Sequence, residues 1–215
     1  MKSFNFFLIG IFIFFSNSLF SQDKYFSQWK KEVCDKANTA KSVNYLTETE
    51  KEVIYLMNLA RLDGALFSKT YLNKFFDQGN NKTNSYAKSL IVELSNLKGL
   101  SVLYSDKQLF NAASFHATDI GKAGLVSHNS TDGTTFSVRV RKYKPSGCLA
   151  ENCQFGYNDA LSIVCDLLID EGIESLGHRI NILNPSHNSV GVAIREHKEY
   201  GVCCVQDFCC ETGEQ

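Results

Sequence analysis

Residues 189–206 read SVGVAIREHKEYGVCCVQ, and the spacing of apolar side chains changes here to a strand-like alternation. Apolar side chains alternate with small ones from Val190 to Ile194, and after a polar turn at 197–199 the alternation resumes at Tyr200. Such alternation places one face of a strand against a core, and two runs of it around a short polar turn are typical of a β-hairpin. We therefore expect an antiparallel hairpin over these residues.

The stretch before the hairpin repeats its apolar residues at helical spacing. A capping box at Thr47 and Glu50 marks the first helix, because each side chain can satisfy a backbone N–H at the helix start. Asn158 or Asp159 is the expected cap of a later helix. The helices are predicted over residues 47–64, 71–76, 85–97, 106–123 and 158–168. Helices followed by a hairpin predict an α+β domain, in which helices pack on an antiparallel sheet.

The first residues differ in kind from the rest of the chain. Lys2 is followed by an almost wholly apolar run, 4–15, and then by small residues up to Ser21. This order is typical of a secretory signal peptide. A transmembrane anchor is the rival interpretation, but the run is shorter than the roughly 20 residues that span a bilayer. We expect a signal peptide over 1–21, a loose polar extension over 22–46 and one domain over 47–209, secreted to the periplasm or the extracellular space.

The composition excludes some classes of partner. The 215 residues carry a formal net charge of -1, with 44% hydrophobic and 21% charged residues, which is ordinary for one soluble domain. A nearly neutral chain without a basic run lacks the features that nucleic acid binding requires. Beyond the leader, no segment is apolar for long enough to cross a membrane. We therefore expect no nucleic acid partner, no stable membrane insertion and a monomer.

Export changes how the eight cysteines are interpreted, because an oxidising compartment favours disulfides. Cys148 and Cys153 flank a short predicted loop, and this is the pair that we expect to bridge first. Cys165 lies in an apolar helical run, where a buried free thiol and a disulfide are equally compatible with the sequence. The four cysteines within 203–210 lack the spacing of a zinc knuckle or ribbon, so a cysteine-based metal site is the minority interpretation.

Several short motifs follow one another in a fixed order, and together they resemble the CAP superfamily of cysteine-rich secretory, antigen 5 and pathogenesis-related class 1 proteins. They are Asn58-x-x-Arg61, Leu109-x-x-Ala112-x-x-x-His116-x-x-Asp119, Ser127-His128, Phe136-x-x-Arg139, Ala150-Glu151-Asn152, Gly177-His178-Arg179 with Asn181-Ile182-Leu183, and Val190-Gly191-Val192. Each motif alone is weak, and their order and spacing make the resemblance specific. The stretch 167–172 before Gly177 is similar to the bacterial branch. The resemblance implies a three-layer α-β-α sandwich with a central antiparallel sheet flanked by helices.

The resemblance also places His128, Glu151 and His178 in one cleft, with a further acid on the helix before His178. Asp170 is the expected fourth member. Its neighbour Glu171 is acidic too, but adjacent helical positions point about 100° apart, so only one of the two is expected to face the cleft. Such a group can bind a divalent metal, run acid/base chemistry or hold a loop together, and the residues alone do not rank these roles.

A metal site would consist of His128, Glu151, Asp170 and His178, in which the two imidazoles supply nitrogen ligands and Glu151 either ligates the metal directly or orients a bound water. Zinc fits this set of ligands best, and two imidazoles would hold it weakly. Because imidazole must be deprotonated to bind a metal, affinity should fall as the pH drops through roughly 6.5.

The remaining polar residues of the motifs have structural interpretations. His116, His187 and His197 are expected to be satisfied structural histidines. Asn152 and Arg179 are expected to hydrogen-bond the backbone around the cleft. Arg61 and Arg139 are expected to do the same, or to pair with a carboxylate.

Three functions are compatible with these features. The resemblance favours a secreted, non-enzymatic binding or effector module, whose extracellular ligand is a lipid such as a sterol, or a protein. A metal-assisted, protease-like hydrolase using the same cleft is the alternative, but the chain has no His-Glu-x-x-His or Gly-x-Ser-x-Gly motif and no nucleophile that a motif places beside the histidines. In the third, the four cleft residues serve the fold alone and the protein acts through its surface.

Overall fold

The structure is a computed structural model that describes residues 26–80, 82–144 and 146–210. The helical elements are η1 (Phe26–Gln28), α1 (Lys31–Ala37), α2 (Glu48–Leu62), α3 (Gly64–Phe67), the π-helical η2 (Ser68–Leu72), α4 (Asn73–Asp77), α5 (Ser85–Asn96), α6 (Lys107–Ala123), α7 (Phe136–Arg141), α8 (Ala160–Ile169) and α9 (Gly177–Leu183). The strands are β1 (Tyr104–Ser105), β2 (Cys148–Phe155), β3 (Ser189–His197) and β4 (Gly201–Cys210). The expected signal peptide lies outside the described residues. Within the described ranges, no helix combines the length and the apolar character needed to span a bilayer.

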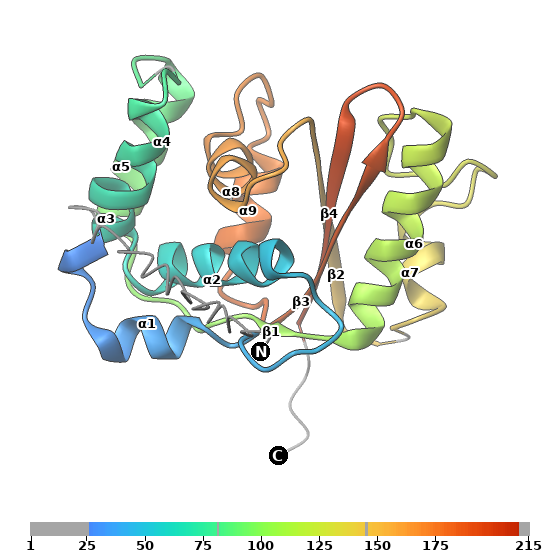
Figure 1. The fold of residues 1–215 in the computed structure, drawn as a ribbon, viewed down its shortest axis with the longest axis horizontal. Helices are drawn as coiled ribbons and strands as arrows, with labels where there is room; N and C mark the ends of the chain where they lie inside the picture. Colours follow the sequence, from blue (N-terminus) through green and yellow to red (C-terminus); the bar gives the residue numbers. More distant parts are fainter. Residues whose placement is uncertain (1–25, 81, 145, 211–215) are drawn as a thin grey trace, which may run out of the picture.

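Four strands form one sheet in the order β1-β3-β4-β2. β4 pairs antiparallel with β3 and with β2, and the short β1 runs parallel to β3. Figure 1 shows α6 and α7 on one face of the sheet and α2, α8 and α9 on the other. The predicted α+β fold and α-β-α layering are therefore confirmed, and the sheet is mixed because of β1 alone.

The local signals in the sequence act where they were expected. Thr47 and Glu50 form the complete capping box at the start of α2. Asp159, not Asn158, caps α8 by accepting a hydrogen bond from the Ser162 backbone N–H. The predicted hairpin is formed by β3 and β4. Short-range patterns thus fix the elements on both sides of the sheet.

Two glycines let α6 lie directly against β3. A Cβ at Gly191 would stand 2.1 Å from the Leu109 carbonyl carbon, and one at Gly121 would stand 2.1 Å from the Glu196 carbonyl oxygen. No larger residue fits at such a close approach of two backbones. The glycine of the Val190-Gly191-Val192 motif is therefore a packing requirement, which holds one face of α6 on the sheet.

Residues 26–46 differ from the loose extension that the sequence indicated. Trp29 and Ala37 are buried in the main core. The Trp29 indole donates to the Thr70 hydroxyl at 3.1 Å, and the Asn58 amide donates to the Ala37 carbonyl at 2.9 Å. The apolar residues that pack here are interspersed with lysines and asparagines, and for that reason the sequence indicated a polar extension.

The expected disulfide between Cys148 and Cys153 is wrong, because Cys148 is bonded to Cys210. Cys148 and Cys153 both lie in β2, and five steps along an extended strand separate their Cα atoms by roughly 16 Å. Cys148 instead faces Cys210 directly across the β2–β4 pair. Free thiols are found at Cys34, Cys153, Cys165, Cys203 and Cys204. The default expectation of disulfides thus fails for most of the chain, and Cys165 is a buried thiol.

Candidate functional site

His178 forms a tightly held pair with Asp170. The His178 Nδ1 lies 2.7 Å from Asp170 Oδ1. The other carboxylate oxygen accepts the backbone N–H groups of His178 at 2.9 Å and Arg179 at 3.3 Å, at the start of α9. Because a carboxylate accepts hydrogen bonds, Nδ1 carries the proton and Nε2 is left with its lone pair. Asp170 thus orients the ring and caps α9 at the same time.

Asp170 and Glu171 both line the cleft beside His178, which corrects the expectation that only one of them would. α8 ends at Ile169, and Asp170 follows it in the left-handed conformation with φ of 59°. The angle between adjacent helical positions therefore no longer applies. Asp170 is buried, whereas Glu171 is exposed. The choice of Asp170 as the partner of His178 agrees with the hydrogen bond between them.

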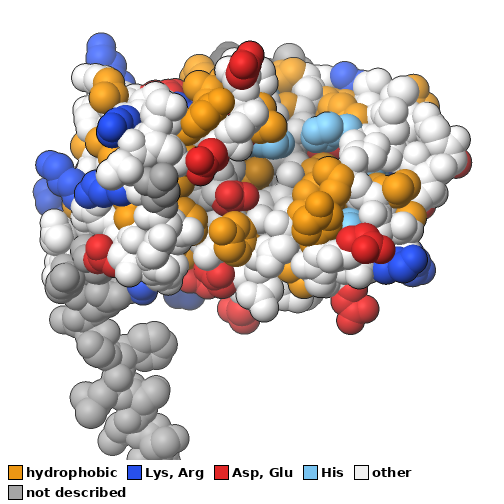
Figure 2. All heavy atoms as spheres, turned by 90° about the horizontal axis from the view of Figure 1, so that it is seen from above, with side chains coloured by type: hydrophobic (Ala, Val, Ile, Leu, Met, Phe, Trp, Pro, Cys, Tyr) orange, Lys and Arg blue, Asp and Glu red, His pale blue; other side chains and the backbone are white. Residues whose placement is uncertain are grey.

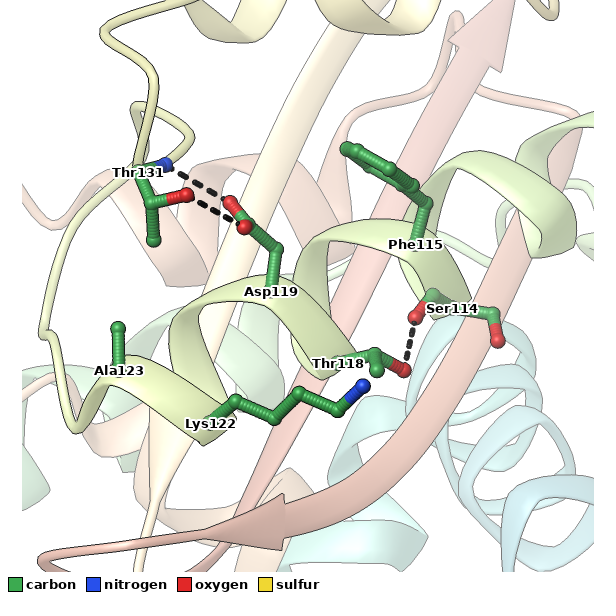
Figure 3. Close-up of a pocket in the computed structure, with 7 residues that line it drawn as sticks. All are labelled: Ser114, Phe115, Thr118, Asp119, Lys122, Ala123 and Thr131. Carbon is green, nitrogen blue, oxygen red and sulfur yellow. Dashed lines mark hydrogen bonds between the residues drawn. The ribbon is translucent and has the colours of Figure 1, made fainter.

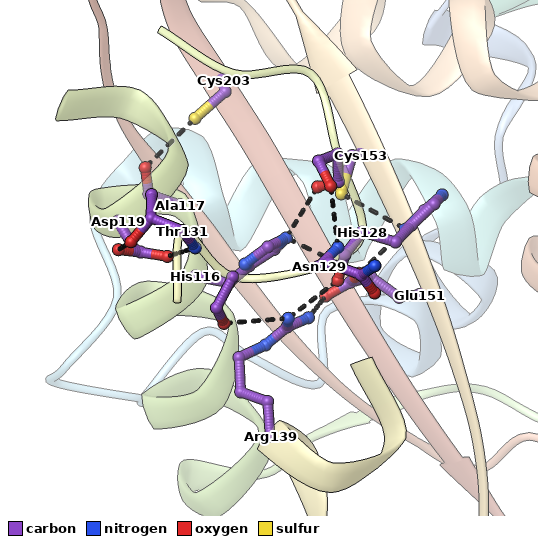
Figure 4. Close-up of polar contacts among 12 residues, drawn as sticks. His116, Ala117, Asp119, His128, Asn129, Thr131, Arg139, Glu151, Cys153 and Cys203 are labelled. Atoms are coloured by element: carbon purple, nitrogen blue, oxygen red, sulfur yellow. Dashed lines mark hydrogen bonds and ion pairs between the residues drawn. The ribbon is translucent and has the colours of Figure 1, made fainter. Parts of the chain in front are cut away.

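His128 forms a second pair, with Glu151 of β2. Its Nδ1 lies 2.9 Å from Glu151 Oε1, and the Arg139 guanidinium of α7 contacts the other oxygen. Arg139 also donates to the His128 carbonyl at 2.8 Å. Figure 4 shows His128 and Arg139 converging on Glu151. Burial acts to raise the pKa of Glu151, but the hydrogen bond from His128 and the charge of Arg139 outweigh it and lower that pKa.

A second acid, Asp207, lies beside Glu151. The two residues face each other across the β2–β4 pair. Asp207 is fully buried, and no N–H or hydroxyl donor among the described residues reaches its carboxyl oxygens. Burial and the neighbouring charge of Glu151 raise the pKa of Asp207 well above its ordinary value. A neutral Asp207 can donate to the Glu151 carboxylate, so Arg139 balances one buried negative charge and not two.

His116 and Cys153 complete the surroundings of Glu151. The ligand atoms of His116, Glu151 and Cys153 lie within 4.8 Å of one another, a group that could hold a metal ion. The His116 Nε2 also lies 2.9 Å from the Ser127 carbonyl. Burial lowers the pKa of His116, although the charge of Glu151 opposes this. Burial and the same charge raise the pKa of Cys153 well above its ordinary value, which keeps its thiol protonated.

Cys153 connects the two histidine pairs. Its Sγ lies 3.8 Å from the His128 Nδ1. It also lines a cleft of about 250 Å³ whose walls include Asp170 and His178 but neither His128 nor Glu151, so the expected single cleft holds only one of the two pairs. The side chain of His128 is 54% exposed and that of His178 is 22% exposed. Figure 2 shows histidine side chains reaching the surface next to acidic and apolar ones on this face.

The other predicted polar residues support the backbone. The Asn152 amide donates to the His178 carbonyl at 3.2 Å, and Arg179 donates to the carbonyls of Leu168 and Ile169. Arg61 donates to four backbone carbonyls: those of Ser101, Ile182, Asn184 and His187. These structural interpretations agree with the geometry; Arg139 pairs with the Glu151 carboxylate, and Arg179 also contacts Glu93 at 3.2 Å.

His187 and His197 are buried structural histidines, as expected. The His187 Nδ1 lies 2.9 Å from the Asn181 carbonyl, and the His197 Nε2 lies 3.0 Å from the Leu125 carbonyl.

The sequence did not reveal Cys153 and Asp207 as members of the site. Cys153 follows Glu151 by two residues, so the alternation of β2 puts both on one face. That signal was hidden while Cys153 was expected to lie in a loop and to form a disulfide. Asp207 could be found only from the pairing of β4 with β2, which no local pattern specifies.

A larger groove of about 670 Å³ lies on the outer face of α6 (Figure 3). Its acid, Asp119, accepts hydrogen bonds from the Thr131 backbone N–H at 2.8 Å and from the Thr131 hydroxyl. None of the histidines lines it. The groove is therefore separate from the histidine pairs and offers no comparable set of ligand atoms.

Comparisons with known proteins give one family match. A family model described as the cysteine-rich secretory protein family, CAP, matches residues 54–208. A search of the curated proteins found no match.

Two solved structures are similar to this chain. An extracellular protein from Bacillus anthracis that contains an SCP domain is 23% identical, with a TM-score of 0.46 over 59% of this chain and 39% of that one. An outer surface protein from Borrelia burgdorferi is 18% identical, with a TM-score of 0.45 over 67% of this chain and 96% of that one. The matched part thus spans 39% of the length of the Bacillus protein.

Proposed function

This chain belongs to the cysteine-rich secretory protein family, CAP, and we propose that it is a secreted, non-enzymatic binding module that holds a divalent metal between His178, at the cleft, and His128, on the other side of Cys153. The leader-like pattern in residues 1–21 supports export. The extracellular ligand of the module, a lipid or a protein, is part of the same proposal.

The observation that carries the metal proposal is the pairing of each histidine with a buried carboxylate. Metal-binding histidines commonly donate one ring N–H to a carboxylate, which fixes the tautomer and directs the other nitrogen at the metal. His178 with Asp170 and His128 with Glu151 have this arrangement. The two Nε2 atoms are thus the proposed ligands. Glu151 and Asp170, first expected to be ligands themselves, act as orienting partners because their oxygens already accept other hydrogen bonds.

The residues fit a borderline cation that is held weakly. Two imidazole nitrogens with water suit zinc better than calcium or magnesium, which prefer more oxygen ligands. The group of His116, Glu151 and Cys153 is the less favourable place for the same ion. Arg139 contacts Glu151 there, and its guanidinium would repel a second cation in a buried site.

The thiol of Cys153 supports binding over hydrolysis. Cys153 lies beside His128 and borders the cleft, so it is the residue to examine as a nucleophile. A cysteine nucleophile needs a lowered pKa to supply thiolate, and here the pKa is raised. Its protonated thiol therefore lacks the activation on which a cysteine hydrolase depends.

Zinc binding by the purified protein tests this proposal. We expect about one zinc per chain at about pH 7.5, held weakly because the protein supplies two imidazole ligands. The double variant His128→Ala/His178→Ala should bind none, whereas Glu171→Ala, which changes a cleft acid outside both pairs, should bind as the parent does. Isothermal titration with zinc measures all three.

Two results would contradict the proposal. Equal zinc binding by the parent and the double variant, or no binding by either, would remove the metal site. Hydrolysis of a broad peptide and ester panel that disappears in the double variant would make the protein an enzyme.

A further inference from the structure

The cleft beside His178 has walls of two chemical kinds. One kind is apolar and includes Phe155, Leu167 and the exposed ring of Tyr200. The other kind accepts hydrogen bonds and includes Asp166, Glu171 and Gln154. The lining contains no lysine and no arginine. The cleft is therefore negative, rich in acceptors and bordered by apolar surface.

Gln154 supplies a buried acceptor that lacks a donor. Gln154 as a whole is 3% exposed. Its amide Nε2 donates to the Phe155 carbonyl at 2.8 Å and to Asp166 Oδ2 at 3.3 Å. Its Oε1 has no hydrogen-bond partner among the described residues. A buried acceptor without a donor is unfavourable, and a ligand with several N–H groups would satisfy it.

The remaining acceptors of the cleft point to a cation. Asp166 lies in the last turns of α8, where the helix dipole favours positive charge. Asp170 is fully engaged by α9, which leaves Asp166, Glu171 and the His178 Nε2 to receive a ligand. A metal ion would make no favourable contact with the apolar walls. A cationic side chain would, because its aliphatic stem packs on them.

We infer that this cleft binds the side chain of an arginine presented by an extracellular peptide or protein. The guanidinium would lie among Asp166, Glu171 and Gln154, and its stem would lie along Leu167. A planar guanidinium can also stack on the ring of Tyr200, as an ammonium cannot, which favours arginine over lysine. The cleft of about 250 Å³ is of the right size for one side chain and is smaller than the pockets that hold drug-sized ligands.

This site shares the cleft with the proposed metal but depends on different residues. Asp166, Glu171 and Gln154 are not the hydrogen-bond partners that orient His128 and His178. Binding of the arginine side chain and binding of the metal can therefore be tested with different variants. Both would lie near the His178 Nε2, and zinc should therefore weaken arginine binding.

Calorimetric titration of the purified protein with a short capped peptide, one arginine between alanines, tests the inference. We expect saturable binding that weakens with salt. The same peptide with citrulline, the neutral analogue of arginine, should bind about tenfold more weakly, because charge-assisted hydrogen bonds are lost. Asp166→Asn should weaken arginine binding by about tenfold, and Glu171→Gln by less, since Glu171 is exposed.

Glu196→Gln is the matched control, because it removes one negative charge from an exposed position outside this cleft. It should leave arginine binding unchanged. Glu171→Gln alters an exposed side chain and is expected to fold normally, so the test does not depend on Asp166→Asn alone. Equal binding of the arginine and citrulline peptides, or no binding of either, would overturn the inference. If zinc binds and the arginine peptide does not, the inference fails while the proposed metal site stands. If the arginine peptide binds and zinc does not, the metal site fails while the inference stands.

Discussion

His178 and His128 each contact a buried carboxylate, but the two carboxylates are held by different forces. Asp170 is held by backbone N–H groups at the start of α9. Glu151 is held by the charge of Arg139, next to a second acid, Asp207. The Asp170 pair therefore depends on local geometry, whereas the Glu151 pair depends on a balance of buried charges. The two halves of the site should respond differently to mutation and to pH.

The largest effect is expected when the charge balance is broken. Arg139→Met removes the guanidinium that contacts Glu151, and it leaves that charge buried beside Asp207. We expect a loss of about 3–5 kcal/mol in the free energy of unfolding, because an uncompensated buried charge is strongly unfavourable. Urea denaturation of the parent and the variant measures this difference in the free energy of unfolding.

Arg141→Met is the matched control, since Arg141 lies on the same helix but is exposed. It should cost less than about 0.5 kcal/mol. If the two variants unfold alike, Glu151 is not held by charge and the contrast between the pairs disappears.

A smaller effect is expected at the pair that is held by the backbone. Asp170→Ala removes the acceptor for His178 and for two N–H groups of α9. We expect a loss of about 1–2 kcal/mol, which is typical of a lost helix cap with its hydrogen bonds. Thermal unfolding compared with Glu171→Ala, which changes the adjacent acid, isolates the contribution of Asp170. An equal loss of stability in Glu171→Ala would show that the negative charge at this end of the site, and not the capping of α9, is what stabilises it.

The last effect depends on pH and is expected at Asp207. Its pKa is raised in the folded protein, so the folded state holds a proton that the unfolded state has released above about pH 4. Stability should therefore fall as the pH rises from that value towards the raised pKa. Asp207→Asn cannot titrate and still carries an N–H that can donate to Glu151.

The variant should match the parent near pH 4 and exceed it in stability by a growing amount as the pH rises, because only the parent must keep a proton on Asp207. Melting temperatures across this range measure the difference. A difference that does not change with pH would mean that Asp207 does not titrate on unfolding.

Much of the fold could be predicted because its signals are local. The capping box of Thr47 and Glu50 and the alternation around Val190 involve neighbours in the chain, whose spacing the sequence states directly. Residues 26–46 were missed because their apolar residues are separated by frequent lysines and asparagines. The overall polarity of the segment hid the face that packs on the core.

The candidate site could be predicted only in part. His128, Glu151, Asp170 and His178 follow from the ordered motifs, and the contacts within each pair agree with them. The role of each carboxylate as an orienting partner could not be predicted, because it depends on which oxygen accepts which donor. Arg139 was expected to contact backbone or a carboxylate, and only the folded chain identifies Glu151 as its partner.

The sequence by itself determined the longer helices α2, α5, α6 and α8, the hairpin and the order of the motifs, because caps and apolar periods act between residues a few positions apart. The shorter helices α1, α7 and α9 were not predicted. The tertiary structure decided that Cys148 bonds Cys210, that Asp207 lies against Glu151, and that Cys153 borders the cleft. All three follow from the position of β2 beside β4. β2 and β4 are far apart in the sequence, so their register is set by the packing of the whole sheet. No local sequence pattern predicts it.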